Sequence, residues 1–209
     1  GGALLRDLDR LLAEETGLIT PIGEWVLLEA CRAAMGWKEA TGKDIGISVN
    51  VSPRQFRDPG FTEAVMHALA TSGLAPEQLE LEITERLILD NSIETAEILR
   101  QLDKAGIRLS VDDFGTGYSS LQYLRQFPAD VVKIDKSFVS TGGVCLAEPE
   151  ICRAITMMAD ALGMGVIAEG VETKAQLTQL IDLGCPHGQG YLVSPAVAFD
   201  EATELLLKR

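Results

Sequence analysis

The sequence predicts an α/β fold in which parallel strands alternate with helices, as in a TIM-like (β/α) barrel. Short apolar runs typical of buried strands recur along the chain, and segments with helical spacing of apolar residues lie between them. Each apolar run also ends in an acidic, amide or lysine side chain. Buried strands should not end repeatedly in polar groups unless those ends meet at a polar site, which is where such barrels place their active sites.

The strand-like runs have similar lengths and occur at regular intervals. They cover residues 47–52, 79–85, 109–115, 131–135, 166–172 and 188–194. The helices expected between and after them are Pro21–Lys38, Phe61–Ser72, Ser92–Ala105, Ile151–Leu162, Lys174–Leu183 and Asp200–Leu207. Thr20 is the expected N-cap of the first helix, with Pro21 at its first helical position. Glycines after several helices are typical stop signals, and the loop Ser140–Pro149 is expected to be an excursion within the fold.

The chain of 209 residues is expected to form a single domain, 1–209. Six strands are predicted, whereas a closed barrel of this kind has eight. The deficit falls near the N-terminus, where Gly1–Arg10 leads directly into a helix-like segment. The expectation is therefore an N-terminally incomplete barrel.

The net charge, the apolar runs and the cysteines indicate which partners and which compartment to expect. A net charge of −13 argues against binding polymeric nucleic acid, which normally requires basic patches. A small anionic ligand is still compatible if divalent cations bridge it to carboxylates. No apolar run approaches the ~20 residues of a membrane span. The cysteines Cys31, Cys145, Cys152 and Cys185 lack metal-ligand spacing, so buried free thiols in a reducing cytoplasm are expected.

The pair Asp112-Asp113, followed by Phe-Gly-Thr-Gly-Tyr-Ser-Ser, is the sharpest single motif. Adjacent carboxylates at a strand end can each reach a different metal ion, or one can bridge two ions. The glycines let the following loop bend tightly near a ligand. The alternative is an acidic turn with Asp as a helix cap, but the other polar strand ends favour a site.

The run Leu-Glu-Leu-Glu-Ile-Thr-Glu offers Glu82 as a candidate metal ligand, and Glu85 just past its end could brace a neighbouring loop. Glu80 is expected to be solvated or salt-bridged. Asn50, in Ser-Val-Asn-Val-Ser, offers a hard amide oxygen, although an isolated Asn there is more often a turn former.

The later strand ends add a cation and further oxygen ligands. Lys133 can stabilise a phosphate oxygen or orient a water, whereas singly it would most often pair with Asp135. Glu169 and Glu172 offer one ligand or base and one supporting residue, and Gln189 suits a hydrogen bond at the barrel mouth. The set is rich in oxygen and nearly free of nitrogen, which favours Mg²⁺ or Mn²⁺ over zinc.

The motifs VNVSPRQF, LELEITE, DDFGTGYSSL, VKIDKSFV, AEGVET and GCPHGQGYL, in this order, resemble the EAL domain family of cyclic di-GMP phosphodiesterases, most strongly over residues 11–209. The resemblance implies a modified TIM barrel that uses Mg²⁺ or Mn²⁺, with Ca²⁺ as an inhibitor, to cleave cyclic di-GMP to linear pGpG. It also implies a homodimer attached to sensory or GGDEF-type domains in a longer cytoplasmic or membrane-anchored protein. By resemblance, the metal ligands are Asn50, Glu82, Asp112 and Asp113; the catalytic residues are Lys133, Glu169 and Glu85; and the supporting residues are Glu172, Gln189 and Asp135.

The N-terminal segment departs from the family pattern. Gly2-Ala3-Leu4-Leu5-Arg6 resembles the Glu-Ala-Leu motif with Gly2 in place of the glutamate that binds metal, so impaired hydrolysis is expected of the chain as written. The alternative function is a degenerate domain that binds cyclic di-GMP or a protein partner without turnover. An unrelated barrel enzyme such as an aldolase is disfavoured, because no phosphate-binding glycine pattern or Schiff-base context surrounds Lys133.

Overall fold

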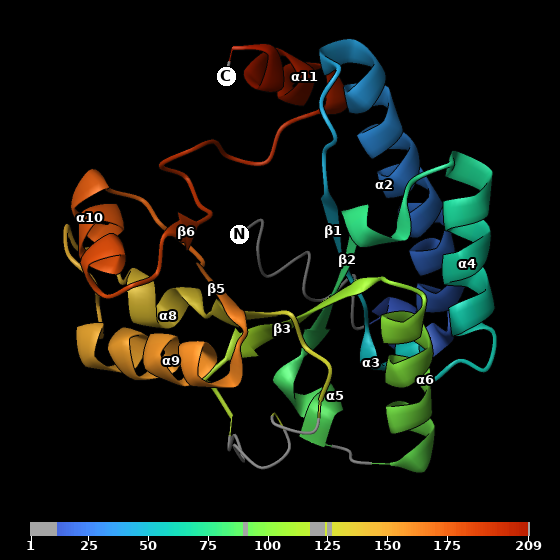
Figure 1. Cartoon of the computed structure of the whole chain (residues 1–209), viewed down its shortest axis with the longest axis horizontal. Coiled ribbons are helices and arrows are strands. Elements are labelled where there is room, and N and C mark those ends of the chain that lie inside the picture. Colours follow the sequence, from blue (N-terminus) through green and yellow to red (C-terminus); the bar gives the residue numbers. More distant parts are fainter. Residues whose placement is uncertain (1–11, 90–91, 118–123, 125–126, 209) are drawn as a thin grey trace. The chain divides into compact units, whose positions relative to one another are not determined.

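The computed structural model of the chain describes residues 12–208 except for 90–91, 118–123 and 125–126 (Figure 1). In this part of the chain six strands follow one another in a single sheet with the order β1-β2-β3-β4-β5-β6. The strands are β1 (Ile47–Asn50), β2 (Leu79–Thr84), β3 (Arg108–Phe114), β4 (Val131–Ile134), β5 (Gly165–Ala168) and β6 (His187–Gly188). The pairs β3–β4, β4–β5 and β5–β6 are parallel, so the carboxyl ends of these strands lie along one edge.

Helices connect the strands, as the sequence pattern predicts. Their bounds are α2 (Ile19–Thr41), α3 (Pro53–Phe56), α4 (Phe61–Ser72), η1 (Pro76–Gln78), α5 (Glu85–Leu89), α6 (Ile93–Lys104), α8 (Lys136–Val139), α9 (Pro149–Leu162), α10 (Lys174–Asp182) and α11 (Phe199–Leu207). Several ends follow local sequence signals. Ser92 caps α6 by accepting a hydrogen bond from the Thr95 backbone, and Gly73 ends α4 in the left-handed conformation. Among the described residues, no helix combines the length and apolarity needed to cross a membrane.

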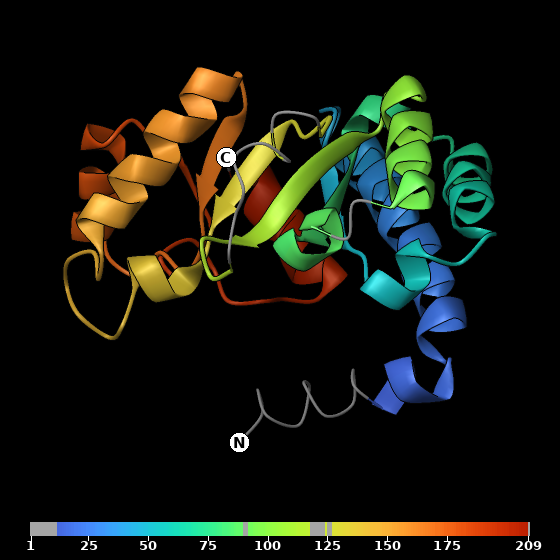
Figure 2. The same ribbon diagram turned by 90° about the horizontal axis from the view of Figure 1, so that it is seen from below.

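The contacts divide the chain into two compact units, which we call the first and second unit. The first contains residues 1–81 and 92–108, and the second contains residues 82–91 and 109–209. In the first unit, α2 packs against α4, α3 and β1, and Leu27, Phe56 and Val65 are buried in its core. In the second unit, α9 packs against β4 and β5, which lie beside it in Figure 2. Val132, Ile134 and Ala168 on these two strands are fully buried.

The structure corrects several expectations about element ends. Strands β5 and β6 are shorter than the apolar runs that predicted them, because the chain bends at Glu169 and again at Gly190. Helix α2 begins at Ile19, so Thr20 lies inside it and is not its cap. Cys145 is exposed, whereas Cys31, Cys152 and Cys185 are buried free thiols as expected. The segment around Gly2, expected to carry the altered Glu-Ala-Leu motif, lies outside the described residues.

Candidate active site

A bulge at the end of β3 brings Asp112 and Asp113 to the same edge of the sheet. The register of β3 on β4 shifts between Val111 and Phe114, so the two residues between them extend the strand by one position relative to β4. Asp113 has φ of 54°, a left-handed conformation that a non-glycine residue rarely adopts. In a regular strand neighbouring side chains point to opposite faces. The bulge and the left-handed Asp113 overcome that alternation.

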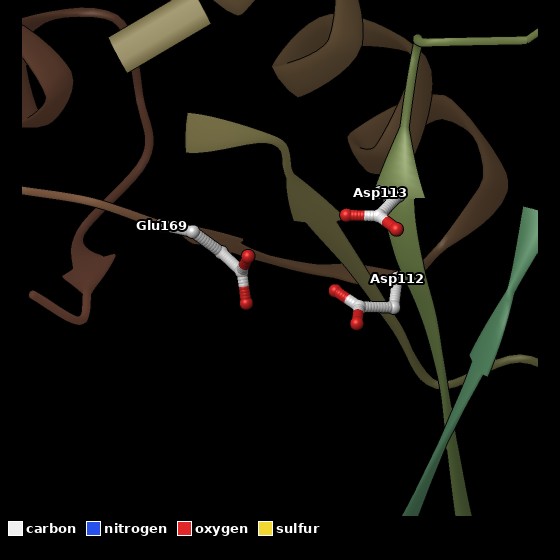
Figure 3. Close-up of side chains that lie close together, drawn as sticks. All are labelled: Asp112, Asp113 and Glu169. Carbon is white, nitrogen blue, oxygen red and sulfur yellow. The ribbon is translucent and has the colours of Figure 1, made fainter. Parts of the chain in front are cut away.

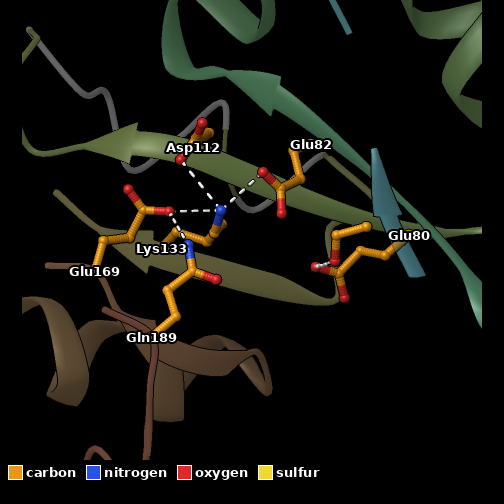
Figure 4. Close-up of polar contacts among 7 residues, drawn as sticks. Glu80, Glu82, Asp112, Lys133, Glu169 and Gln189 are labelled. Atoms are coloured by element: carbon orange, nitrogen blue, oxygen red, sulfur yellow. Dashed lines mark hydrogen bonds and ion pairs between the residues drawn. The ribbon is translucent and has the colours of Figure 1, made fainter. Parts of the chain in front are cut away.

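Lys133 lies at the centre of the carboxylates. Its Nζ is 2.6 Å from Glu169 Oε1, 2.8 Å from Glu82 Oε2 and 3.6 Å from Asp112 Oδ1. Figure 4 shows these three contacts, and the lysine side chain is only 2% exposed. The sequence alternative of a simple pair with Asp135 is therefore wrong, since the ion pairs of Lys133 join it to acids from β2, β3 and the end of β5.

Glu169 receives a second donor on the same oxygen as Lys133. Gln189 Nε2 donates to Glu169 Oε1 at 2.6 Å. The backbone holds both residues in place, because Glu169 N donates to Ile134 O and Gln189 N donates to Ala168 O. With Oε1 occupied by two donors, Oε2 is the oxygen of Glu169 that can serve a cation or a water.

Asp112, Asp113 and Glu169 offer three oxygens that lie within 4.8 Å of one another (Figure 3). Asp112 Oδ1 is buried and accepts no hydrogen bond among the described residues, and its ion pair with Lys133 is long, at 3.6 Å. A buried oxygen without a full set of donors is costly, and a bound cation is one way to satisfy it.

The charges of the site perturb its own titration. Burial raises the pKa of Glu169 even though the Lys133 ammonium opposes the rise. Burial and repulsion from Asp112 and Asp135 raise the pKa of Asp113. Burial by itself would lower the pKa of Lys133, but attraction to Glu82 and Asp112 and hydrogen bonds to Glu169 and Glu82 outweigh it and raise that pKa. Lys133 therefore keeps its positive charge at neutral pH, and the three carboxylates around it outnumber this single cation.

Glu85 contacts the loop that follows the aspartates. Its Oε2 accepts a hydrogen bond from Gly115 N at 3.2 Å. A Cβ at Gly117 would lie 2.9 Å from Glu85 Oε1, and a Cβ at Gly115, where φ is 94°, would lie 2.9 Å from the ring of Phe138. The positive φ and the Phe138 ring favour glycine at position 115, whereas a side chain at position 117 would displace the Glu85 carboxylate.

The remaining predicted site residues have other hydrogen-bond partners, although Asp135 lies close enough to Asp113 to raise the pKa of that carboxyl. Asp135 caps α8 by accepting from Ser137 N at 2.9 Å, and Glu172 accepts from Ser140 Oγ at 2.9 Å. Asn50 ends β1 in the first unit with an exposed side chain, and its assignment as a metal ligand stays a prediction. Glu80 was expected to be either solvated or salt-bridged, and the structure shows it largely buried and salt-bridged. It accepts a hydrogen bond from Ser48 Oγ and pairs with Arg108 at 3.8 Å.

The sequence patterns missed two features at this edge. The bulge in β3 has no local signal beyond the two adjacent aspartates. The buried side chain of Gln176 could have been noticed, because a glutamine three residues after Thr173 is the signature of a capping box.

The sequence matches the family description "EAL domain" over residues 10–196. The chain belongs to the EAL domain family. The bifunctional diguanylate cyclase/cyclic di-GMP phosphodiesterase MucR of Pseudomonas aeruginosa is 43% identical over 182 residues, which are 87% of this chain and 27% of MucR. The cyclic di-GMP phosphodiesterase NbdA of the same organism is 41% identical over 193 residues, 91% of this chain and 25% of NbdA. The chain thus spans about a quarter of the length of these relatives.

Solved EAL structures confirm the expected α/β fold of the TIM-like type. The structure of the PaMucR phosphodiesterase in complex with c-di-GMP superposes with a TM-score of 0.85 at 41% identity, covering 91% of this chain and 77% of that one. The Klebsiella pneumoniae BlrP1 complex with calcium and c-di-GMP superposes with a TM-score of 0.69 at 28% identity, covering 83% of this chain and 42% of that one.

Proposed function

We propose that this EAL domain binds cyclic di-GMP and hydrolyses one of its phosphodiester bonds to give linear pGpG, with Mg²⁺ or Mn²⁺ as cofactor. The observation that carries the proposal is the buried Lys133 ammonium, held between Glu82, Asp112 and Glu169 beside an all-oxygen cluster. The names of MucR and NbdA as cyclic di-GMP phosphodiesterases support the choice of substrate.

The residues present fit a divalent cation. Asp112, Asp113 and Glu169 supply hard oxygen ligands at mutual distances that one cation can span, and Asp112 Oδ1 is buried with no hydrogen-bond donor among the residues that the structure describes. We assign Asp112, Asp113 and Glu82 to cation binding, and we add Asn50 from the sequence resemblance. Glu169 serves either as a further ligand or as the general base. A bound divalent cation would polarise a phosphoryl oxygen and make a water more acidic.

The chain's own residues have distinct roles in this proposal. Because its pKa is raised, Lys133 cannot accept a proton; it binds a phosphate oxygen or orients the attacking water. Glu169 suits proton acceptance from that water, because burial raises its pKa toward the working pH and its Oε2 is the oxygen not used by Lys133 and Gln189. Glu85 holds the Gly115 loop, while Gln189, Glu172 and Asp135 support the site from outside.

The second candidate is a receptor that binds cyclic di-GMP without turnover. The residue that favours it is Gly2, because the segment Gly2-Ala3-Leu4 resembles the Glu-Ala-Leu motif with glycine in place of the glutamate. A receptor needs contacts to guanine and phosphate, but it has no need for a lysine surrounded by carboxylates, so the enzyme remains the first proposal. We expect the 209-residue chain to hydrolyse cyclic di-GMP slowly and to retain ligand binding.

The test compares three proteins with cyclic di-GMP and Mn²⁺: the 209-residue chain, the same chain with Gly2→Glu inside an N-terminal extension of family length, and the extended chain carrying Glu169→Gln. Chromatography follows pGpG, and calorimetry measures binding. We expect the extended chain to form pGpG, its Glu169→Gln variant to lose most of the rate, and all three to bind. Binding without pGpG from the extended chain would establish the receptor, and absence of binding by all three would reject both candidates.

The assembly of the longer protein is a further part of the proposal. MucR is named as a bifunctional diguanylate cyclase and phosphodiesterase, so we infer that this domain is linked to GGDEF-type or sensory domains. The sequence resemblance to the family adds the expectation of a homodimer. Light scattering of the isolated domain with and without cyclic di-GMP would test the dimer.

A further inference from the structure

Gln176, in the first turn of α10, has a fully buried side chain with a complete set of hydrogen bonds. Its Oε1 accepts from Glu172 N at 2.8 Å and from Thr173 N at 2.9 Å. Its Nε2 donates to Val139 O at 3.3 Å and to Gly143 O at 3.2 Å. An amide side chain has two acceptor positions and two donor hydrogens, and all of them are used here.

These four bonds join two segments of the second unit that follow neighbouring strands. Val139 and Gly143 belong to the segment after β4, the strand that carries Lys133. Glu172 and Thr173 belong to the turn after β5, which begins at Glu169. Since β4 and β5 are parallel, both segments leave from the carboxyl edge of the sheet, where the candidate site lies.

Other side chains reinforce the same junction. Thr173 Oγ1 donates to Val144 O at 2.7 Å, and Ser140 Oγ donates to the Glu172 carboxylate at 2.9 Å. The turn is anchored at its other end by the bond from Glu169 N to Ile134 O. The backbone between Glu169 and Thr173 is thus held at both ends. The buried side chain of Gln176 holds the end at Glu172 and Thr173.

Helix capping alone does not account for this geometry. In a capping box the side chain three residues into the helix bonds back to the N-cap backbone, and an ionised glutamate can do that as well as glutamine. The bonds from Gln176 Nε2 reach residues 37 and 33 positions earlier in the chain, and only an amide can donate them.

We propose that Gln176 is a positioning residue for the candidate site. It ties the segment 139–144 to the turn 169–173, and it thereby sets the placement of the Glu169 and Glu172 carboxylates. The inference rests on the proposed function for its catalytic consequence, but its effect on cation binding and local backbone order is independent of turnover.

The test uses the same chemical change at two glutamines of α10. Gln176→Glu keeps the acceptors for Glu172 N and Thr173 N but places a carboxylate against two carbonyl oxygens. Gln179→Glu is the matched control, because Gln179 uses its Oε1 to accept from Leu146 N at 2.9 Å and a carboxylate preserves that bond. The measurements are hydrogen exchange by mass spectrometry, Mn²⁺ affinity by calorimetry, thermal unfolding and pGpG formation.

We expect Gln176→Glu to speed exchange in peptides covering 139–147 and 169–175 while α6 stays protected, and to weaken Mn²⁺ binding about 10-fold or more. Turnover should fall by a similar factor, and Gln179→Glu should match the unmodified chain in every measurement. Unchanged exchange and Mn²⁺ affinity in Gln176→Glu would overturn the proposal. Faster exchange throughout the chain with a lowered melting temperature would also overturn it, because that pattern shows a purely structural residue.

A failure of hydrolysis and a failure of the Gln176→Glu variant to fold have different consequences for the proposal. If the unmodified and extended chains form no pGpG, the proposed hydrolysis fails, while the exchange and Mn²⁺ results still decide the role of Gln176. If Gln176→Glu does not fold, Ser140→Ala decides, since it removes the bond from Ser140 Oγ to Glu172 at the surface of the same junction, together with the longer bond from Gly142 N to Ser140 Oγ at 3.4 Å. A loss of Mn²⁺ affinity of about 3-fold or more supports the proposal, and an unchanged affinity rejects it.

Discussion

Replacing Lys133 by methionine should destabilise the folded chain strongly in the absence of divalent cations. The substitution keeps the length and apolar stem of the side chain but removes the ammonium, which lies 2.6 Å from Glu169 and 2.8 Å from Glu82. At an effective dielectric constant of about 20, one such pair is attractive by roughly 6 kcal/mol. The variant would leave the carboxylates of Glu82, 7% exposed, and Glu169, 18% exposed, without a counter-charge.

Protonation limits the loss of stability. Neutralising one glutamate at pH 7 costs roughly 3–4 kcal/mol from its ordinary pKa, which is less than keeping several buried carboxylates charged and unpaired. We therefore expect Lys133→Met to lower the free energy of unfolding by about 3–5 kcal/mol at pH 7, the usual range for removing one partner of a buried ion pair.

The loss should depend on pH with a definite sign. The pKa of Glu169 is already raised in the folded chain, so the folded state binds more protons than the unfolded state above the ordinary glutamate pKa. Stability from this group is thus gained as the pH falls and lost as it rises through the folded pKa. Removing Lys133 raises the Glu169 pKa further, so the deficit of the variant should shrink to roughly 1–2 kcal/mol at pH 5.

Urea unfolding followed by circular dichroism, at pH 7 and pH 5 with EDTA, measures these differences. Lys174→Met, at an exposed lysine of α10, is the control and should change stability by less than about 0.5 kcal/mol. Added Mg²⁺ should recover part of the loss at pH 7, because the cation substitutes for the ammonium. A deficit below about 1 kcal/mol at pH 7, or one that does not shrink on acidification, would contradict the assignment of Lys133 as the counter-charge of the cluster.

Two further predictions concern the metal and the thiols. Asp112→Asn should weaken Mn²⁺ affinity, measured by calorimetry, about 10-fold or more. The melting temperature without cations should be unchanged or higher, because the substitution removes one of several mutually repelling carboxylates. A variant that melts lower but binds Mn²⁺ normally would refute this. Cys145 is exposed, whereas burial raises the pKa of Cys152 and of Cys185 to about 11, so a thiol reagent at pH 8 should label Cys145 first in the native chain and the other two only after unfolding. Rapid native labelling of Cys152 or Cys185, detected by mass spectrometry of peptides, would be inconsistent with the buried positions of their side chains.

The alternation of strands and helices could be predicted from the sequence because it depends on local periodicity and end signals. Phe61–Ser72 ends at Gly73 as predicted, and α6 begins directly after its capping serine. The sequence predicted strands β5 and β6 to be longer than they are, because apolar residues continue past the points at which the chain bends. An apolar run shows that residues are buried, but pairing with a neighbouring strand decides where a strand ends.

The chemistry of the site could also be anticipated in part. Parallel strands bring their carboxyl ends to one edge, so acids and a lysine at the ends of β3, β4 and β5 had to lie near one another once the fold was known. That argument identifies which residue types meet. It does not say which oxygen faces which nitrogen.

Only the tertiary structure decided the contacts. The bulge and the left-handed Asp113 place two adjacent aspartates at one edge, against the alternation of a regular strand. Lys133 joins acids of other strands instead of Asp135, two residues away, and Gln176 reaches carbonyls more than thirty residues earlier. Each of these depends on backbone segments far apart in the chain being held within hydrogen-bond distance, and local sequence patterns carry no information about such distances. The sequence by itself determined the family and the residues available for chemistry, and the packing of the second unit determined how they are paired.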